Sequence, residues 1–134
     1  DINSMIEESI AGRPFTSRLH PDVPINLIYV KEAVRAFLQY SKVDESKLGR
    51  KTYNIKGFNL KPVELVDVLR RRLPEVHIDF DPDESDAALA LRKAMTKQMD
   101  ERLAQADWGW QPKYFLEETV DDFIAELGPE HSDQ

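Results

Sequence analysis

The sequence has 134 residues, of which 41% are hydrophobic and 32% charged, and its formal net charge is −7. This length fits one globular domain, and the composition is too apolar for a disordered chain. The acidic balance argues against nucleic-acid binding as the main function, because contact with phosphates requires a net basic face.

The sequence contains no Cys, which excludes a disulfide framework and a thiolate nucleophile. It has no apolar run long enough to cross a membrane and no signal-peptide pattern at its start. Because a chain without Cys fits a reducing compartment, we expect a cytoplasmic protein with no membrane contact. The first residue is Asp1 rather than Met, so we also expect the chain to begin inside a longer reading frame or after trimming.

The first 41 residues alternate between helical and extended patterns. Apolar residues recur at helical spacing over 2–10, and Gly12 follows as a stop signal. Alternation over 15–19 predicts a short strand, and the two prolines within 20–24 predict a turn. Residues 25–30 are apolar and β-branched, which predicts a second strand. A helix follows, with a continuous apolar stripe formed by Val30, Ala33, Val34, Phe37 and Leu38.

The middle of the chain repeats this alternation. The polar residues 41–50 predict a surface loop, and 52–55 form a short strand candidate. Pro62 suits the first turn of a helix whose apolar positions continue to Leu73. Alternating apolar residues over 76–80 predict a half-buried strand.

The last third is mostly helical. Residues 86–107 contain no Pro or Gly, and an apolar residue recurs there every four positions at Leu91, Met95, Met99 and Leu103. The segment 108–112 ends this pattern, and 116–127 predict a last helix. We expect residues 129–134 to form a flexible tail. Alternating helices and short strands predict an α/β fold, and the short strands would leave exposed edges.

No pattern of catalytic or metal-ligating residues is present in the sequence. The acidic run 79–86 lacks the Gly and the final Glu of a calcium loop, so Ser85 or Asp86 is expected to cap the next helix. The three His residues are widely spaced, and the five Gly residues are isolated, which excludes a Gly-rich phosphate loop. Trp108 and Trp110 are interpreted mainly as aromatic anchors of the last helix, with a pocket lining as the alternative.

Three segments in order resemble one known family. INLIYVKEAVRAF at 25–37, TYNIKGFNLKPVELVDVL at 52–69 and MDERLAQADWGWQP at 99–112 are similar to the C-terminal part of extended short-chain dehydrogenases/reductases, the NAD-dependent epimerase/dehydratase group. The likeness is strongest to short-chain L-threonine dehydrogenases. It implies that residues 1–128 are the substrate-side C-terminal lobe of a Rossmann-type enzyme, with TYNIKG as a strand of its parallel sheet.

The sequence also departs from the family. Lys31 replaces the first of two acids usual at the start of the helix, whereas Glu32 keeps the second. Ile25 stands where nucleotide-sugar epimerases carry an Arg, and no Arg-x-Gly-Asp stretch surrounds Ala90, which argues against a UDP-sugar substrate. Ala94–Thr96 replaces the Ser-Trp-Pro stretch that borders the substrate in threonine dehydrogenases.

The resemblance implies a function that depends on another part of a protein. Nothing in the sequence resembles the family's N-terminal Rossmann half, which carries the Gly-rich dinucleotide turn and the Tyr-x-x-x-Lys pair. We therefore expect no cofactor, no metal and no catalytic residue in this chain, with NAD bound by the full-length parent. The substrate would be a small polar hydroxy compound, bordered by Arg18, Asn26 and Met95. The alternative for each residue is a purely structural role: Arg18 would be solvated, Asn26 would form a hydrogen bond within a turn, and Met95 would lie in the core.

A second hypothesis is a stand-alone dimerisation or interaction module derived from such a lobe. The apolar stripe over 86–107 would then drive self-association, and a two-fold homodimer is the commonest closed arrangement. The partners expected from the sequence are thus the missing Rossmann half, a small-molecule substrate and a second copy.

Overall fold

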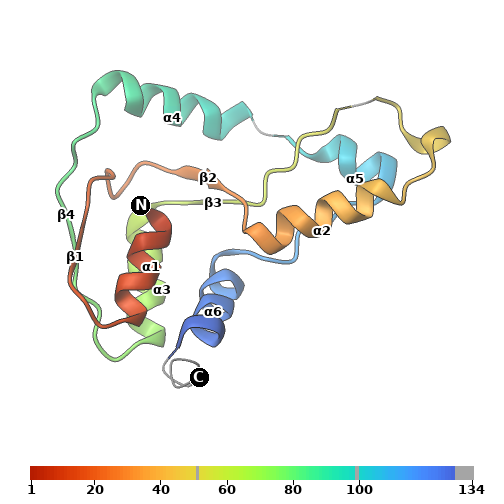
Figure 1. Cartoon of the computed structure of the whole chain (residues 1–134). Helices are drawn as coiled ribbons and strands as arrows, with labels where there is room; N and C mark the ends of the chain where they lie inside the picture. Colours follow the sequence, from red (N-terminus) through yellow and green to blue (C-terminus); the bar gives the residue numbers. More distant parts are fainter. Residues whose placement is uncertain (51, 99, 129–134) are drawn as a thin grey trace.

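Short helices and three-residue strands alternate along the chain in the computed structural model, which describes residues 1–50, 52–98 and 100–128. Helices and strands do not separate into different halves of the sequence (Figure 1), and this mixed pattern confirms the predicted α/β class. In chain order the elements are α1 (Ile2–Ile10), β1 (Phe15–Ser17), β2 (Ile25–Leu27), α2 (Val30–Ser41), the 3-10 helix η1 (Glu45–Lys47), β3 (Phe58–Leu60), α3 (Pro62–Arg72), β4 (Ile78–Phe80), α4 (Asp86–Gln98), α5 (Arg102–Trp108) and α6 (Leu116–Leu127).

The strands form two separate two-stranded sheets. β1 pairs in parallel with β4, so that Phe15 lies opposite Ile78. β2 pairs antiparallel with β3, and Ile25 lies opposite Leu60. The α1, α3 and α6 helices stand together on one side of the molecule, while α2 and α5 extend away on the other (Figure 1).

The strand predicted at 52–55 is wrong for the part of the chain that the structure describes. Residues 52–55 form no ladder there, and the strand is β3 instead, which begins after Gly57. Gly57 has a φ of +72°, and a Cβ at this position would lie 2.3 Å from the carbonyl oxygen of Leu27. Only glycine lets the two backbones approach this closely, so the pairing of β2 with β3 starts here.

The single helix predicted over 86–107 is divided into α4 and α5. The backbone N–H of Arg102 donates to the side chain of Asp100 at 3.0 Å, which is a local turn that competes with the helical ladder. No Pro or Gly signals this break in the sequence, so apolar spacing alone predicts one helix. Met99 lies outside the described residues.

Two apolar clusters stabilise the fold. The larger lies between α1, α3, α6 and the strands, and it includes the fully buried residues Met5, Leu65, Leu69 and Val120. The smaller joins α2 to α5 through the buried residues Ala36, Ala104 and Trp110. Ion pairs fasten α3 to α6 at their surface, since Arg72 pairs with Glu117 at 2.8 Å and with Asp121 at 2.7 Å.

The apolar stripe of α2 does not belong to either core. Val30, Val34, Phe37 and Leu38 are 65%, 52%, 72% and 52% exposed, whereas Glu32 and Ala36 are the buried residues of this helix. The helical spacing was predicted correctly, but the apolar face of the helix, which we expected to be buried, is exposed to solvent. The expected tail 129–134 lies outside the described residues. In the described part, no helix is both long enough and apolar enough to span a membrane.

Candidate functional site

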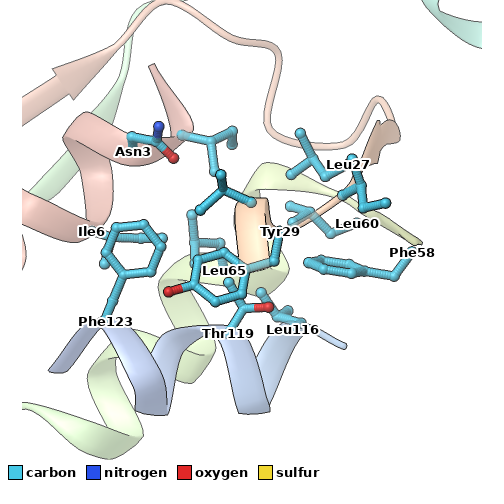
Figure 2. A pocket seen from close by; sticks show the side chains of 13 residues that line it. Asn3, Ile6, Leu27, Tyr29, Phe58, Leu60, Leu65, Leu116, Thr119 and Phe123 are labelled. Carbon is cyan, nitrogen blue, oxygen red and sulfur yellow. The ribbon is translucent and has the colours of Figure 1, made fainter. Parts of the chain in front are cut away.

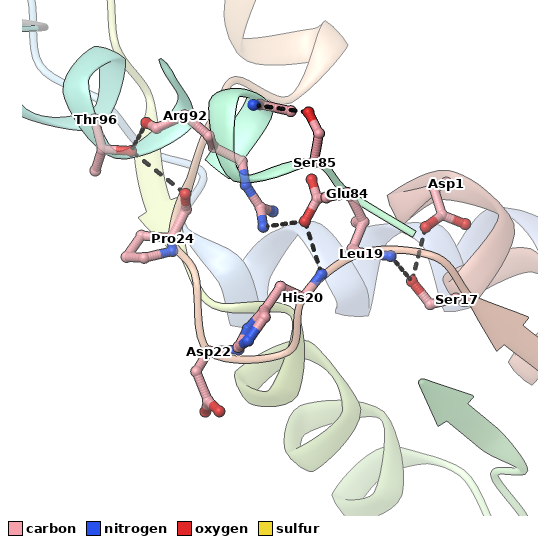
Figure 3. A network of polar contacts seen from close by, with 11 residues as sticks. Asp1, Ser17, Leu19, His20, Asp22, Pro24, Glu84, Ser85, Arg92 and Thr96 are labelled. Atoms are coloured by element: carbon pink, nitrogen blue, oxygen red, sulfur yellow. Dashed lines mark hydrogen bonds and ion pairs between the residues drawn. The ribbon is translucent and has the colours of Figure 1, made fainter. Parts of the chain in front are cut away.

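Two of the three residues predicted to border the substrate meet where β2 approaches α4. The Asn26 side-chain amide donates to the backbone carbonyl of Met95 at 2.9 Å. The Thr96 hydroxyl lies 2.9 Å from the Arg92 carbonyl and 3.4 Å from that of Pro24 (Figure 3). Asn26 therefore bonds to a distant helix rather than within a turn, and Met95 is 53% exposed rather than a core residue. We name Asn26, Glu84, Arg92 and Thr96 the polar junction.

Glu84 and Arg92 provide the charge of the polar junction. The two side chains form an ion pair of 2.6 Å and are only 18% and 13% exposed. The same Glu84 oxygen accepts the backbone N–H of His20 at 2.9 Å, which fixes the turn before β2 (Figure 3). A pair with both partners this far from water is costly to break, because either charge alone would remain desolvated. The junction thus holds α4 in one place against β2.

The polar junction retains hydrogen-bonding capacity. The Nε and Nη1 atoms of Arg92 and the Oδ1 atom of Asn26 are buried and find no partner among the described residues. The two Arg92 nitrogens are hydrogen-bond donors, and the Asn26 amide oxygen is an acceptor. All three atoms are covered by the protein in this structure.

Glu84 and Arg92 were not predicted from the sequence as part of a site. The available signal was spacing, since Arg92, Met95 and Thr96 stand at i, i+3 and i+4 and therefore share one face of α4. Arg92 could therefore have been predicted to lie beside Met95, which was already a predicted substrate contact.

Arg18, the third predicted substrate residue, lies outside the polar junction. Its side chain is 66% exposed and pairs with Asp83 at 3.4 Å and with Asp81 at 4.0 Å. No contact within the described residues joins it to Asn26 or Met95. The predicted capping role of the acidic run is confirmed at Ser85, whose hydroxyl accepts the Ala88 N–H at 3.2 Å. Among the described residues, no group of three or more acidic or His side chains is placed to hold a metal.

An apolar cavity of about 360 Å³ lies between α1, α6 and the β2–β3 pair (Figure 2). Asn3, Tyr29 and Thr119 are its polar lining residues, and the Tyr29 hydroxyl donates to Asp122 at 2.5 Å. Burial, and then the Asp122 carboxylate, raise the pKa of Tyr29, so that its hydroxyl stays protonated at neutral pH. Tyr29 is therefore a poor general base, and the cavity lacks a group that transfers a proton near neutral pH.

A buried carboxylate connects α2 to the segment before α6. Glu32 is fully buried and accepts the backbone N–H groups of Lys113 at 3.1 Å and Tyr114 at 2.9 Å. It also accepts from Arg35, whose guanidinium lies 4.4 Å from the centre of the Trp110 ring. The acid that the family pattern retains is thus a structural clamp in this chain.

The two Trp residues have different surroundings. Trp110 is fully buried, and its indole N–H donates to Glu101 at 3.2 Å. Trp110 is thus a buried structural residue, but it packs in the small cluster with Ala36 and Ala104 rather than against the last helix. Trp108 is half-buried and lines an open apolar groove of about 540 Å³ between α2 and residues 52–55. Trp108 therefore also fits the alternative of a pocket lining.

Comparison with known proteins relates this chain to L-threonine 3-dehydrogenases and to epimerase/dehydratase proteins. It is 26% identical over 126 residues to the mitochondrial L-threonine 3-dehydrogenase of Bos taurus, covering 94% of this chain and 33% of that protein. It is 24% identical over 103 residues to an uncharacterized epimerase/dehydratase of Staphylococcus saprophyticus, covering 76% of this chain and 32% of the relative. No protein-family model matches the sequence.

Solved structures of the same group share the fold. A GalE-like L-threonine dehydrogenase from Cupriavidus necator in its holo form has a TM-score of 0.78 and 29% identity, over 92% of this chain and 40% of that one. A Bacillus cereus UDP-glucuronic acid 4-epimerase, solved with UDP-glucuronic acid and NAD, has a TM-score of 0.67 and 14% identity, over 94% of this chain and 40% of that one. The chain spans about a third of the length of its curated relatives, which is consistent with a C-terminal piece of an extended short-chain dehydrogenase/reductase.

Proposed function

We propose that this relative of L-threonine 3-dehydrogenases is the substrate-side lobe of an NAD-dependent oxidoreductase or epimerase acting on a small polar hydroxy substrate. The observation that carries the proposal is the polar junction, which lies on a fold shared with threonine dehydrogenases. Asn26 keeps a buried acceptor there and Arg92 keeps buried donors, without partners among the described residues, and a polar substrate would offer groups to both.

In this proposal the chain contributes substrate contacts and no chemistry of its own. None of its Tyr residues has a Lys four positions later, since positions 33, 44, 57 and 118 hold Ala, Asp, Gly and Glu. The hydride acceptor would be NAD bound by the rest of the enzyme, and a Tyr outside this chain would transfer the proton. The whole protein's activity is inferred from relatives that are about three times as long.

The Rossmann half expected from the sequence analysis is the principal partner in this proposal. The substrate would be enclosed when that half covers the β2–α4 side of the lobe. Closing a site in this way expels water and strengthens polar contacts to the substrate.

A second candidate function is a self-associating module, favoured by the exposure of α4. Leu91 and Met95 are 62% and 53% exposed, and Leu103 in α5 is 45% exposed. A homodimer would cover such positions without any further domain. Sedimentation velocity on the isolated chain distinguishes the candidates, because the lobe hypothesis does not require a dimer.

The experiment that tests the lobe hypothesis is a chimaera in which this chain replaces the matched 40% of the Cupriavidus necator L-threonine dehydrogenase. We expect NAD affinity close to that of the parental enzyme, but altered KM values over a panel of threonine, serine and 3-hydroxy acids. Asn26→Ala should raise KM further, and Asn3→Ala, at an exposed position of α1, serves as the matched control. A parental KM profile that is insensitive to Asn26→Ala would contradict the proposal.

A further inference from the structure

The apolar cavity between α1, α6 and the β2–β3 pair has a buried hydroxyl in its wall. Of its polar lining residues, Asn3 is exposed to solvent, and the Tyr29 hydroxyl already donates to Asp122. Thr119 is only 7% exposed, and its hydroxyl oxygen is buried without a hydrogen-bond partner among the described residues. Burying a hydroxyl without a partner is costly, so the Thr119 hydroxyl is available to a molecule in the cavity.

The sequence of α6 places this hydroxyl in an otherwise apolar row. Leu116, Thr119 and Phe123 stand at i, i+3 and i+7, and all three line the cavity. Figure 2 shows the Thr119 side chain pointing from α6 towards the other labelled side chains of the lining. A helical Thr often donates to the carbonyl three or four positions earlier, but this hydroxyl forms no such bond with a described residue.

The cavity lies on the opposite face of the β2–β3 pair from the polar junction. Leu27 lines the cavity, whereas the preceding residue Asn26 bonds to Met95 on α4. Successive strand residues point to opposite faces, so the two side chains cannot serve one site. On β3 the buried residues Phe58 and Leu60 line the cavity as well. A molecule in the cavity is therefore separate from the proposed substrate contacts.

The size and charge of the cavity limit what it can hold. Its volume of about 360 Å³ lies within the usual range of ligand sites. An apolar cavity of about 150 Å³ holds benzene, so this one has room for about 10–14 non-hydrogen atoms. Every described side chain of its lining is uncharged, and the Asp122 carboxylate behind Tyr29 is paired with Lys31 at 2.6 Å. A charged ligand would lose its hydration here without gaining a counter-charge.

We propose that the cavity binds a neutral, mainly apolar molecule that carries one hydroxyl or carbonyl oxygen, with Thr119 as its hydrogen-bond partner. The Tyr29 hydroxyl spends its proton on Asp122, so Thr119 is the buried side chain that can donate to the ligand. Val30, at 65% exposed, forms an open part of the lining through which a ligand enters. This site goes beyond the proposed function, which uses a polar substrate on the other face of β2.

The test uses four ligands that share one skeleton and differ in one group. They are 4-phenylbutan-1-ol, butylbenzene, 4-phenylbutanoate and protonated 4-phenylbutylamine. Amide chemical-shift titration of the chain measures both the affinity and the position of each ligand. We expect the alcohol to bind one-to-one with a Kd below about 1 mM, butylbenzene to bind more weakly, and the two ions to show no saturable binding.

Thr119→Val removes the hydroxyl and nearly keeps the shape of the side chain. It should raise the Kd of the alcohol about 3–10-fold, as the loss of one neutral hydrogen bond implies, and change that of butylbenzene by less than about twofold. Thr16→Val is the matched control at an exposed position of β1, and it should leave both affinities unchanged. An equal loss for the alcohol and for butylbenzene would overturn the role of Thr119.

The position of the ligand provides an independent measurement. Shifts caused by the alcohol should be confined to amides of α1, α6, β2 and β3, while those of Arg92 and Lys93 on α4 stay in place. Shifts centred on α4 would overturn the proposal in favour of the polar junction. A linear response without saturation, which indicates partition onto the surface, or equally tight binding of 4-phenylbutanoate would overturn it as well.

Discussion

Replacing Glu32 tests how the chain holds the segment before α6. Its carboxylate is fully buried and accepts two backbone N–H groups, from Lys113 and Tyr114, in addition to its contact with Arg35. A hydrogen bond to a charged group contributes about 1.5–3 kcal/mol. Glu32→Gln keeps the shape but places an NH2 group opposite one of the N–H donors, so one bond is lost and one remains.

We therefore expect Glu32→Gln to lower the free energy of unfolding by about 2–3 kcal/mol and Tm by on the order of 10 °C. Glu32→Ala should cost about 3–5 kcal/mol, because it leaves both backbone donors and the half-buried Arg35 without their carboxylate. Such losses are large against a total stability of about 5–15 kcal/mol for a domain.

Urea unfolding followed by Trp fluorescence measures these losses, since Trp110 lies against Arg35. Hydrogen exchange at Lys113 and Tyr114 reports the local bonds directly. Glu118→Gln is the matched control, because Glu118 is exposed on α6, and it should change stability by no more than about 0.5 kcal/mol. If Glu32→Gln and Glu118→Gln unfold at the same urea concentration, the buried carboxylate does not clamp the segment and the reasoning is refuted.

Four further outcomes are expected. Trp110→Ala should cost about 3–5 kcal/mol by urea unfolding, because the ring is fully buried, and Trp108→Ala distinctly less; equal losses would contradict the assigned burial. The isolated chain should show no micromolar binding of NAD by calorimetric titration, and stoichiometric binding would contradict a lobe without a cofactor site. Lys31 and then Tyr29 donate hydrogen bonds that lower the pKa of Asp122 below its ordinary 3.8, so its stabilisation is present above that pH and is lost as pH falls through the lower folded value. Asp122→Asn should thus destabilise the chain at neutral pH and flatten the acid limb of its stability profile, which a pH series of thermal melts measures; an unchanged limb would exclude Asp122 as its source. If the α4 stripe drives self-association, Leu91→Glu with Met95→Glu should shift the sedimentation coefficient to that of a monomer, and a strictly monomeric parent chain would refute the dimer.

Local signals in the sequence predicted most of the helices. Pro62 begins α3, as its position suggested, and the helical spacing of apolar residues located α1, α2 and α6 within a few residues. These features depend on hydrogen bonds between near neighbours and on propensities of single residues, so they can be read without a structure. The resemblance to extended short-chain dehydrogenases was likewise visible in ordered segments, and the comparisons confirm it.

Tertiary structure decided which surfaces are buried and which side chains meet. Helical spacing cannot tell whether Val34 and Phe37 face a core, because burial depends on what lies opposite, and the described chain places nothing there. The strand formed at 58–60 rather than 52–55, because a ladder requires a second strand and β2 lies beside residues 58–60. At the polar junction Asn26 donates to the carbonyl of Met95, a residue far away in sequence, so only the packing of α4 against β2 could reveal it.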